Sequence, residues 1–510
     1  MKKLLIILLL ITLSSCKTSE EVTSRSTITW YVNFSWYQDD FEDSLVAKTI
    51  EDKFNVDLQI VSPTGDADRK LTSMINQDKL TDLITLEWWN PEVDDLIAAD
   101  QVYALNQLAQ EYDINFSDNI DELVYDYHAL DGNLYYYPNA YFLPEDYAND
   151  NYQASNQCFL VRKDIYEAIG SPDMSTISGY YDAIVKAKAL YPDVSLIGAH
   201  EFNDNGSVSF DEYLMNFLAI PYLKDGEYYD RFTDPEYLAW LKMFNQLYQE
   251  GYIDETIFTD KREQVEEKLN DGGYFTMIYQ RTDIEYPEIN LYHTNPEMVY
   301  IAVDGPANSN HDDPVLPGIG INGWCDTMIS KSSNYPQLSM EIMNFLLSEE
   351  GQKLLYLGVE KTTYTINDQQ EVEINSDLEE LYENNRSEFN AQYGFMDTYW
   401  MLEQTRVNLK WQQDIQAPLA QMANWAKSYT VYPIAEINVN DDIYNNIENK
   451  INNLWSQTLI DLLTSSDEES FDKTLTNFIN QRDSYNYSYY QQVKTQAILK
   501  NMQGLVTDDE

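Results

Sequence analysis

Aromatic side chains follow segments of the chain that have the pattern of β-strands, at the points where these segments end. Trp36 comes shortly after one alternating apolar stretch, and Glu87, Trp88 and Trp89 end a second. Sugars present flat C–H faces and rings of hydroxyl groups, so a site for them combines aromatic plates with carboxylate, amide or guanidinium groups. The residues that could supply this chemistry are Trp36, Glu87, Trp88, Trp89, Arg281 and Trp324. Because the chain has 41 tyrosines and 10 tryptophans, the alternative for each aromatic residue is a place in a hydrophobic core.

Signals for catalysis are weak. The run GIGING at 318–323 matches GxGxxG, but the WCDTMIS that follows has the pattern of a strand, not of a helix that opens on a phosphate. The sequence contains no GxSxG and no HExxH, and its four histidines include no pair at metal-ligand spacing. The loop DYANDN at 146–151 offers oxygen atoms without the spacing of an EF-hand.

We therefore expect no catalytic residue, no metal and no cofactor. Carboxylate pairs suited to glycoside hydrolysis stay open as an alternative, because 86 acidic residues guarantee apparent pairs.

The elements that must position these residues alternate between strand and helix. The pattern predicts strands within 28–34, 54–63 and 80–89, with helices between them. Short connections of this kind imply a parallel sheet covered by helices, and ligands bind such sheets beyond the carboxyl ends of the strands. Later segments read as helices at 237–254, at 340–358 with a break near Gly351, and in long stretches between 395 and 463.

The amino-terminal segment has the layout of a secretory signal. Lys2 and Lys3 precede an apolar run that ends near residue 13, about half the ~20 residues that a membrane-spanning helix needs. Ser14 and Ser15 before Cys16 resemble the lipobox of bacterial lipoproteins, in which the chain is cut before a cysteine that carries lipid. We expect a signal peptide over 1–15, lipidation of Cys16 with palmitate-type chains, and a tether over 16–27. An ordinary signal peptide with a chance cysteine is the alternative.

Composition limits the partners. A chain of 510 residues is too long for one ordinary core, so two lobes are expected. The formal net charge is −54, from 86 Asp and Glu against 32 Lys and Arg, which makes nucleic acid and an anionic membrane surface poor partners. Cys158 and Cys325 lie far apart and lack CxxC spacing, so we expect two buried free thiols, with a disulfide as the alternative.

A series of phrases in order carries a family resemblance. They are VSPTGDADRKLTSMINQDKLTDLITL, LDGNLYYYPNA, FLVRKDIYEAIGSP, LKMFNQLYQEGYID, ISKSSNYPQLSMEIMNFLLSEEGQKLLYLGVEKTTYT and INNLWSQTLIDLLTSSDEESFDKTLTNFI. Together they span most of residues 28 to 480, and the chain resembles the extracellular solute-binding lipoproteins of bacterial ABC importers, in the maltose-binding-like, carbohydrate-associated group. The chain departs from many of these proteins in its acidity and in the aromatic segment SYNYSYYQQ at 484–492.

The resemblance implies an α/β protein with a two-lobe, periplasmic-binding-protein-like fold of type II, in which crossing segments join the lobes around a hinged cleft. By position, the N-terminal lobe would hold 28–142 and 277–313, and the C-terminal lobe 143–276 and 314–500. The run at 318–323 would then cross between the lobes. Tyr141, near the first expected crossing, and Tyr213, in the second lobe, join the ligand-binding candidates.

The function implied is capture of a carbohydrate, an oligosaccharide, and its delivery to the membrane-spanning permease subunits of an ABC transporter. The protein would act as a monomer on the extracellular side of the cell membrane, or in the periplasm, held by its lipid. The alternatives are a surface glycoside hydrolase or lyase, and a surface lipoprotein that binds a ligand without transport.

Overall fold

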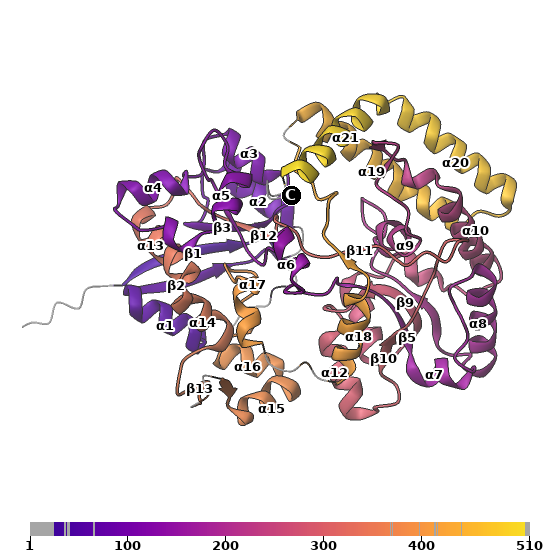
Figure 1. Ribbon diagram of the computed structural model, residues 1–510, viewed down its shortest axis with the longest axis horizontal. Helices are drawn as coiled ribbons and strands as arrows, with labels where there is room; N and C mark the ends of the chain where they lie inside the picture. Colours follow the sequence, from indigo (N-terminus) through magenta and orange to yellow (C-terminus); the bar gives the residue numbers. More distant parts are fainter. Residues whose placement is uncertain are drawn as a thin grey trace, which may run out of the picture.

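The computed structural model describes residues 25–34, 37, 41–64, 67–367, 369, 371–396, 398–412, 415, 417–439 and 441–504. Two α/β lobes lie at opposite ends of its long axis (Figure 1). Both sheets are open, which confirms the predicted two-lobe α/β class. The predicted signal peptide, Cys16 and Trp36 lie outside the described residues, and the described end of the predicted tether already belongs to the first strand.

The first lobe is built on a five-stranded sheet with strand order β2-β1-β3-β12-β4. The first three strands along the chain are parallel, and β12 runs antiparallel to β3. The strands are β1 (Ser26–Val32), β2 (Val56–Val61), β3 (Leu83–Glu87), β4 (Tyr137–Pro138) and β12 (Cys325–Ile329). The lobe also contains α1 (Leu45–Phe54), α2 (Ala67–Asn76), α3 (Glu92–Ala98), α4 (Leu105–Glu111), α5 (Glu122–His128), α13 (Pro336–Leu347), α14 (Glu349–Leu357), the hairpin of β13 (Tyr364–Ile366) and β14 (Val372–Ile374), α15 (Ser376–Asn384), α16 (Arg386–Gln392) and α17 (Thr405–Asn408).

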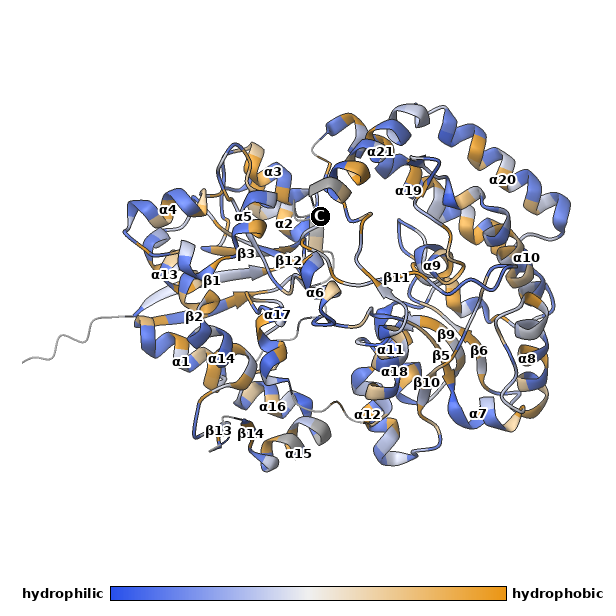
Figure 2. Cartoon of the chain, viewed as in Figure 1, coloured by the Kyte–Doolittle hydropathy of each residue, from blue (hydrophilic) through white to orange (hydrophobic). Residues whose placement is uncertain are grey.

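The second lobe is built on a four-stranded sheet with strand order β10-β5-β9-β6. Its strands are β5 (Gln157–Arg162), β6 (Ser195–Gly198), β9 (Tyr274–Gln280) and β10 (Tyr300–Ala302). Around them lie α7 (Lys163–Ala168), α8 (Ile177–Leu190), a π-helix (Ser209–Tyr213), α9 (Leu214–Phe217), the hairpin of β7 (Leu223–Lys224) and β8 (Glu227–Tyr228), α10 (Pro235–Gln249), α11 (Arg262–Asn270), α12 (Glu285–Thr294), α18 (Ala417–Lys427), α19 (Asp442–Leu463), α20 (Glu468–Asp483) and α21 (Tyr487–Gly504). The strands are largely hydrophobic, whereas the outer helix α20 is largely hydrophilic (Figure 2).

Buried polar groups fix the register at the centre of the first sheet. Strand β3 is central, so both of its faces are covered and its side chains are nearly all buried. Thr85 in this strand accepts a hydrogen bond from Trp30 Nε1 at 2.8 Å and shares one with the Thr327 hydroxyl at 2.9 Å. A buried hydroxyl needs such partners, and these two tie β1, β3 and β12 together.

The predicted division of the chain between the lobes was wrong after residue 276. Strands β9 and β10 both pair with β5, which is a strand of the second-lobe sheet. Residues 277–302 therefore belong to the second lobe. Strand β12 pairs with β3 and β4, which places it in the first lobe. The chain returns to the second lobe only before α18, which packs on β10. The division was taken by position from the family resemblance, and hydrophobic pattern could not correct it, because this pattern identifies a buried strand but not the sheet that it joins.

The crossing segments meet in a short ribbon between the lobes. Strands β11 (Leu316–Pro317) and β15 (Thr430–Val431) pair in parallel there. Residues 318–323 connect β11 to β12, so the glycine-rich run is the crossing loop that was predicted. Gly323 has φ +64°, and a Cβ atom at this position would lie 1.9 Å from the Asn139 carbonyl oxygen. The glycine is therefore required by close packing against the first crossing segment and not by a phosphate.

Three other sequence predictions can be checked. Cys158 and Cys325 are free and buried, which confirms the prediction of two buried free thiols, and they lie in the sheets of different lobes. The helix predicted at 340–358 breaks at Ser348, whose hydroxyl caps α14 by accepting from Gly351 N. The aromatic segment at 484–492, which leads into α21, packs against α19 of the second lobe, where Tyr490 stacks on Tyr444 with ring centroids 5.0 Å apart.

Within the described part of the chain, no helix has the length and apolar character to cross a membrane.

The buried carboxyl group of Glu288 predicts a pH dependence of stability. Its Oε2 accepts from Tyr300 N at 2.9 Å, its Oε1 has no partner among the described residues, and burial raises its pKa to about 8. Between the ordinary pKa and this one the folded chain binds more protons than the unfolded chain, so the free energy of unfolding falls as pH rises through this window. We expect Glu288→Gln to unfold at a higher temperature than the unmodified protein at about pH 9, and at a similar temperature at about pH 5.

The matched control is Glu469→Gln, which neutralises an exposed carboxylate on α20. Thermal melts of all three proteins across this pH range provide the measurement. If Glu288→Gln and Glu469→Gln give the same slope of melting temperature against pH, Glu288 is not protonated in the folded state.

Candidate functional site

The two sheets turn corresponding edges toward each other. The carboxyl ends of β1 and β3 point toward the second lobe (Figure 1). In the second sheet, β6 and β9 end where β5 begins, and β5 is entered from the first crossing segment. Ligands of open α/β sheets bind beyond the carboxyl ends of the strands, so the space between these two edges is the candidate site.

The first-lobe edge carries a group of aromatic rings, which we call the aromatic wall: Phe34, Trp88, Trp89, Trp324 and Tyr399. Trp88 N donates to the Trp324 carbonyl oxygen at 3.1 Å, which joins the end of β3 to the start of β12. The Trp324 ring stacks on Phe34 at 4.9 Å and contacts Tyr399 at 5.4 Å, while Trp89 meets Trp88 edge to face at 5.6 Å. Trp89 is 58% exposed and Tyr399 39%, so the wall presents ring surface to solvent.

Carboxylates adjoin the aromatic wall. Glu87 ends β3 opposite Cys325, and its Oε2 accepts from Asn33 Nδ2 at 3.4 Å. Burial raises the pKa of the Cys325 thiol, and the nearby Glu87 carboxylate adds to the shift. Glu403 follows Tyr399 in the chain, is buried, and accepts from the Thr398 hydroxyl at 3.1 Å. Of these two carboxylates, that of Glu87 lies at the end of the strand that leads into Trp88 and Trp89.

The second-lobe edge carries His200, just after β6. The ring stacks on Tyr279 with centroids 4.0 Å apart, and burial, followed by the charge of Arg262, lowers the pKa of His200 to about 3. The imidazole is therefore neutral at physiological pH. Its Nδ1 lies 3.0 Å from the Ser209 hydroxyl, which donates its one proton to the Ile278 carbonyl oxygen. Nδ1 must then be the protonated nitrogen, and Nε2 is left as an acceptor.

The acceptor atom of His200 has a second acceptor beside it. Asp283 Oδ2 lies 4.0 Å from Nε2, and Nε2 has no hydrogen-bond partner within the described part of the chain. Two acceptors do not bond each other, and Asp283 Oδ2 has Arg262 Nη2 beside it at 3.6 Å, so the buried Nε2 of His200 is the atom left without a donor.

Three of the sequence-predicted residues have partners within the protein. Tyr141 is 5% exposed in the core of the first lobe, with its hydroxyl 3.2 Å from that of Tyr137. Arg281 donates to the Ala154 and Ser155 carbonyl oxygens at 2.8 and 2.9 Å, so it fastens the first crossing segment. Tyr213 is buried, accepts from Gln280 Nε2 at 2.8 Å and meets the His200 ring edge to face at 5.7 Å. Trp88, Trp89, Trp324 and Glu87, by contrast, do lie together.

Sequence reasoning missed Tyr399, Glu403, His200, Asp283 and Glu285. His200 and Asp283 follow strands of a parallel pair, so the rule that selected Trp88 could also have selected them. Tyr399 and Glu403 follow no strand, and nothing in the sequence pattern identifies them.

The lobes approach each other beside the site. The Tyr382 hydroxyl of α15 donates to Glu285 Oε1 of α12 at 3.3 Å. Burial raises the pKa of Tyr356 to about 12, and the carboxylates of Glu403 and Glu285 both add to this shift. Acidic groups from the two lobes therefore lie close to one tyrosine.

A hollow in the first lobe lies away from the candidate site. A hollow of about 360 Å³ lies between Lys53 and Phe54 of α1 and Phe345 of α13. It lies at the end of α1 that leads into β2, at the amino ends of the strands. In an open α/β sheet this is the edge opposite the ligand crevice.

The loop at 146–151 is used structurally. Asp146 is buried and pairs with Arg406 Nε at 2.7 Å, while its Oδ2 also accepts from Leu143 N. Among the described residues, no group of three histidine, cysteine or acidic side chains is arranged to hold a metal ion.

Comparisons with known proteins agree with the two-lobe fold. The model of the family described as bacterial extracellular solute-binding protein matches residues 45–367. The alginate-binding protein AlgQ2, solved without calcium ion, is similar over 93% of this chain and 98% of its own, with 17% identity and a TM-score of 0.68. An EF-hand mutant of the S. pneumoniae ABC-transporter substrate-binding protein FusA, in complex with fructo-nystose, is similar over 94% and 100%, with 14% identity and a TM-score of 0.69.

A third similar structure is the N-glycan transport solute-binding protein NgtS from Streptococcus pneumoniae. It covers 94% of this chain and 99% of its own, with 14% identity and a TM-score of 0.60. No curated relative matches the sequence. At these identities the similarity of the solved structures concerns the fold.

The placement of Arg281 and Trp89 predicts a large effect on stability for one substitution and a small effect for the other. Arg281→Ala would leave two backbone carbonyl groups of the first crossing segment without their donors, which costs about 1–3 kcal/mol of unfolding free energy. Trp89→Ala removes an exposed ring and should change that free energy by about 0.5 kcal/mol or less. Urea denaturation of both variants beside the unmodified protein provides the test. A larger loss for Trp89→Ala would mean that its ring belongs to the core.

Proposed function

The chain belongs to the bacterial extracellular solute-binding protein family, and from this premise we propose that it captures an oligosaccharide between its lobes and delivers it to the permease subunits of an ABC importer. The observation that carries the proposal is the aromatic wall beside carboxylates, opposite an edge with hydrogen-bond acceptors. Aromatic rings cover the C–H faces of sugars, and the acceptors receive hydrogen bonds from sugar hydroxyls. The names of the similar structures, which refer to alginate, fructo-nystose and N-glycans, support the carbohydrate class.

Capture would proceed by closure of the lobes about the crossing segments. A ligand held by the aromatic wall reaches the acceptors of the second lobe only when the lobes approach, so its binding favours the closed arrangement. The hydrogen bond from Tyr382 of the first lobe to Glu285 of the second lobe already connects the two lobes. The permease subunits would then recognise the closed arrangement of the lobes, which is populated mainly when the ligand is bound.

The role of this chain is binding without chemical change of the ligand. Members of the matched family are binding proteins, and the aromatic wall and its acceptors need no reaction to explain them. Incubation with oligosaccharides should leave them unaltered, and release of shorter products would support the hydrolase or lyase alternative instead.

Attachment to the outer face of the cell membrane through lipid on Cys16 completes the proposal, with the protein acting as a monomer. The support is the sequence Ser14-Ser15-Cys16 after an apolar run. Each buried methylene of an acyl chain contributes about 0.8 kcal/mol, so several chains on one cysteine give stable attachment.

Binding by the aromatic wall can be tested with Trp88→Ala. The substitution removes stacking area, so we expect affinity for the bound oligosaccharide to fall by more than about 1 kcal/mol, or roughly fivefold. The control is Tyr335→Ala, which removes a 38% exposed ring before α13, near the amino-end edge of the first sheet. Calorimetry on both variants, with a panel of fructo-, malto- and manno-oligosaccharides, gives the measurement. If the two variants bind the oligosaccharide with equal affinity, the aromatic wall is not part of the ligand-binding site.

The anchor can be tested with Cys16→Ala. Without the thiol the chain cannot receive lipid, so we expect the protein in the soluble fraction or retaining its signal segment. Cell fractionation and incorporation of a labelled fatty acid provide the readout, with Cys158→Ala as the control that keeps the candidate lipidation site. Incorporation that persists in Cys16→Ala would contradict the proposal.

A further inference from the structure

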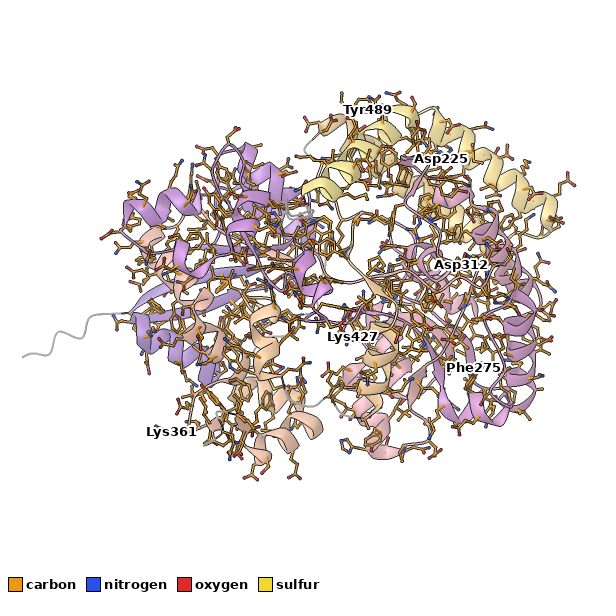
Figure 3. The ribbon with its side chains drawn as sticks, in the orientation of Figure 1. Asp225, Phe275, Asp312, Lys361, Lys427 and Tyr489 are labelled. Carbon is orange, nitrogen blue, oxygen red and sulfur yellow. The ribbon has the colours of Figure 1, made fainter. Side chains whose placement is uncertain are left out.

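The first half of α21, the last helix of the chain, is fastened to the second lobe. Figure 3 shows Tyr489 at the start of this helix, where its hydroxyl donates to Asp441 Oδ2, at the start of α19, at 2.6 Å. Further along, Lys494 Nζ donates to Glu448 Oε1 of α19 at 3.1 Å. The Thr495 hydroxyl oxygen accepts from a backbone N–H of β8 at 2.9 Å. This half of α21 therefore moves with the second lobe.

The other half of α21 carries Asn501 to the junction of the lobes. Figure 1 shows α21 running from the second lobe to the place where the two lobes meet. From Thr495 to Asn501 the helix rises about 9 Å, at about 1.5 Å per residue. Asn501 is 6% exposed, so its amide group has to find partners within the protein.

The amide group of Asn501 uses both its nitrogen and its oxygen. Its Nδ2 donates to the carbonyl oxygens of Ile434 at 3.0 Å and Glu436 at 3.2 Å, in the connection that leads from β15 toward α19. Because carbonyl oxygens only accept, these bonds fix the orientation of the amide and leave Oδ1 as an acceptor. Oδ1 lies 3.2 Å from the Tyr127 hydroxyl, which must then be the donor. Burial, followed by the charge of Glu436, raises the pKa of Tyr127 to about 12, so the hydroxyl keeps its proton at neutral pH.

The hydrogen bond from Tyr127 to Asn501 connects the two lobes. Tyr127 lies on α5 of the first lobe, whereas Asn501 belongs to a helix fastened to the second. The connection that Asn501 holds is also tied to the crossing loop at 318–323, because Asn322 Nδ2 donates to the Glu436 carbonyl oxygen at 3.2 Å. The tip of α21, a crossing loop and a first-lobe helix therefore meet beside the segments about which the lobes can rotate.

From these contacts we propose that α21 is a strut between the lobes, in which the hydrogen bond from Tyr127 to Asn501 limits rotation of the lobes about the crossing segments. An α-helix is stiffened by its own backbone hydrogen bonds, and this one is fastened along half of its length. Rotation of the first lobe must therefore break the bond to Asn501 or bend α21. The strut acts in the protein without ligand, so the inference does not depend on the class of ligand.

The experiment measures the distance between two spin labels, one on each lobe, in the ligand-free, full-length protein. The labels are attached through Glu111→Cys on α4 and Lys473→Cys on α20, both exposed, in a Cys16→Ala background. Cys158 and Cys325 are buried, so labels attach only at the introduced cysteines. Double electron–electron resonance then gives the distribution of distances between the lobes.

The variant Tyr127→Phe removes only the bond between the lobes, and Tyr125→Phe is its matched control. Both residues lie on α5, but the Tyr125 hydroxyl donates to the Gly132 carbonyl oxygen at 2.9 Å, within the first lobe. We expect the population of rotated arrangements to rise roughly twofold to tenfold in Tyr127→Phe, which is the effect of one hydrogen bond, and to stay unchanged in Tyr125→Phe. Equal distance distributions in these two variants would overturn the strut.

A second pair of variants tests the tip of α21. Asn501→Leu removes the bonds to both sets of partners with little change in size, and Gln496→Leu changes an exposed residue of the same helix. Asn501→Leu should raise the population of rotated arrangements at least as much as Tyr127→Phe, and Gln496→Leu should not raise it. Thermal melts establish that each variant is folded. If Asn501→Leu widened the distance distribution and Tyr127→Phe did not, Asn501 would act only on the connection to α19, and the strut would be overturned.

Discussion

The passage of the chain between the lobes constrains everything else in this molecule. The first crossing segment is fastened by Arg281 through two backbone carbonyl groups, and Ser155 in the same segment donates its hydroxyl proton to the Pro317 carbonyl oxygen at 2.7 Å. The second crossing segment pairs with residues 430–431 as a parallel ribbon. Backbone groups in a connection of this kind must find partners, and they find them in each other. The lobes thus keep fixed edges opposite one another while remaining separate cores.

This arrangement explains how much of the fold could be read from the sequence. The strands β1, β2 and β3 alternate with helices over a short stretch of chain, so local pattern was enough to predict them and to place Trp88 at a carboxyl end. Strand β12 joins β3 from more than 200 residues away, and a hydrogen bond between the Thr85 and Thr327 hydroxyls links the two strands inside the sheet. A buried apolar run carries no record of such a partner, so the lobes were divided wrongly after residue 276.

The same distinction holds for the candidate site. Glu87, Trp88, Trp89 and Trp324 could be predicted because they stand next to strands. Arg281 also follows a strand, yet its guanidinium is used by backbone carbonyl groups, and Tyr141 turns into the core. Residue type and position along the chain give candidates, whereas the competition between ligand and protein partners is decided only in three dimensions.

Closure is the step at which the ligand's chemistry and the hinge act together. The single hydrogen bond from the Tyr382 hydroxyl to the Glu285 carboxylate contributes only about 1.5–3 kcal/mol. To move a two-state equilibrium from mostly open to mostly closed takes about 5.5 kcal/mol of differential binding. That difference must come from contacts that the ligand makes with both edges at once. A ligand whose sugar rings stack on the aromatic wall would have to reach groups of the second-lobe edge as well, and it can do so only when the two edges approach each other.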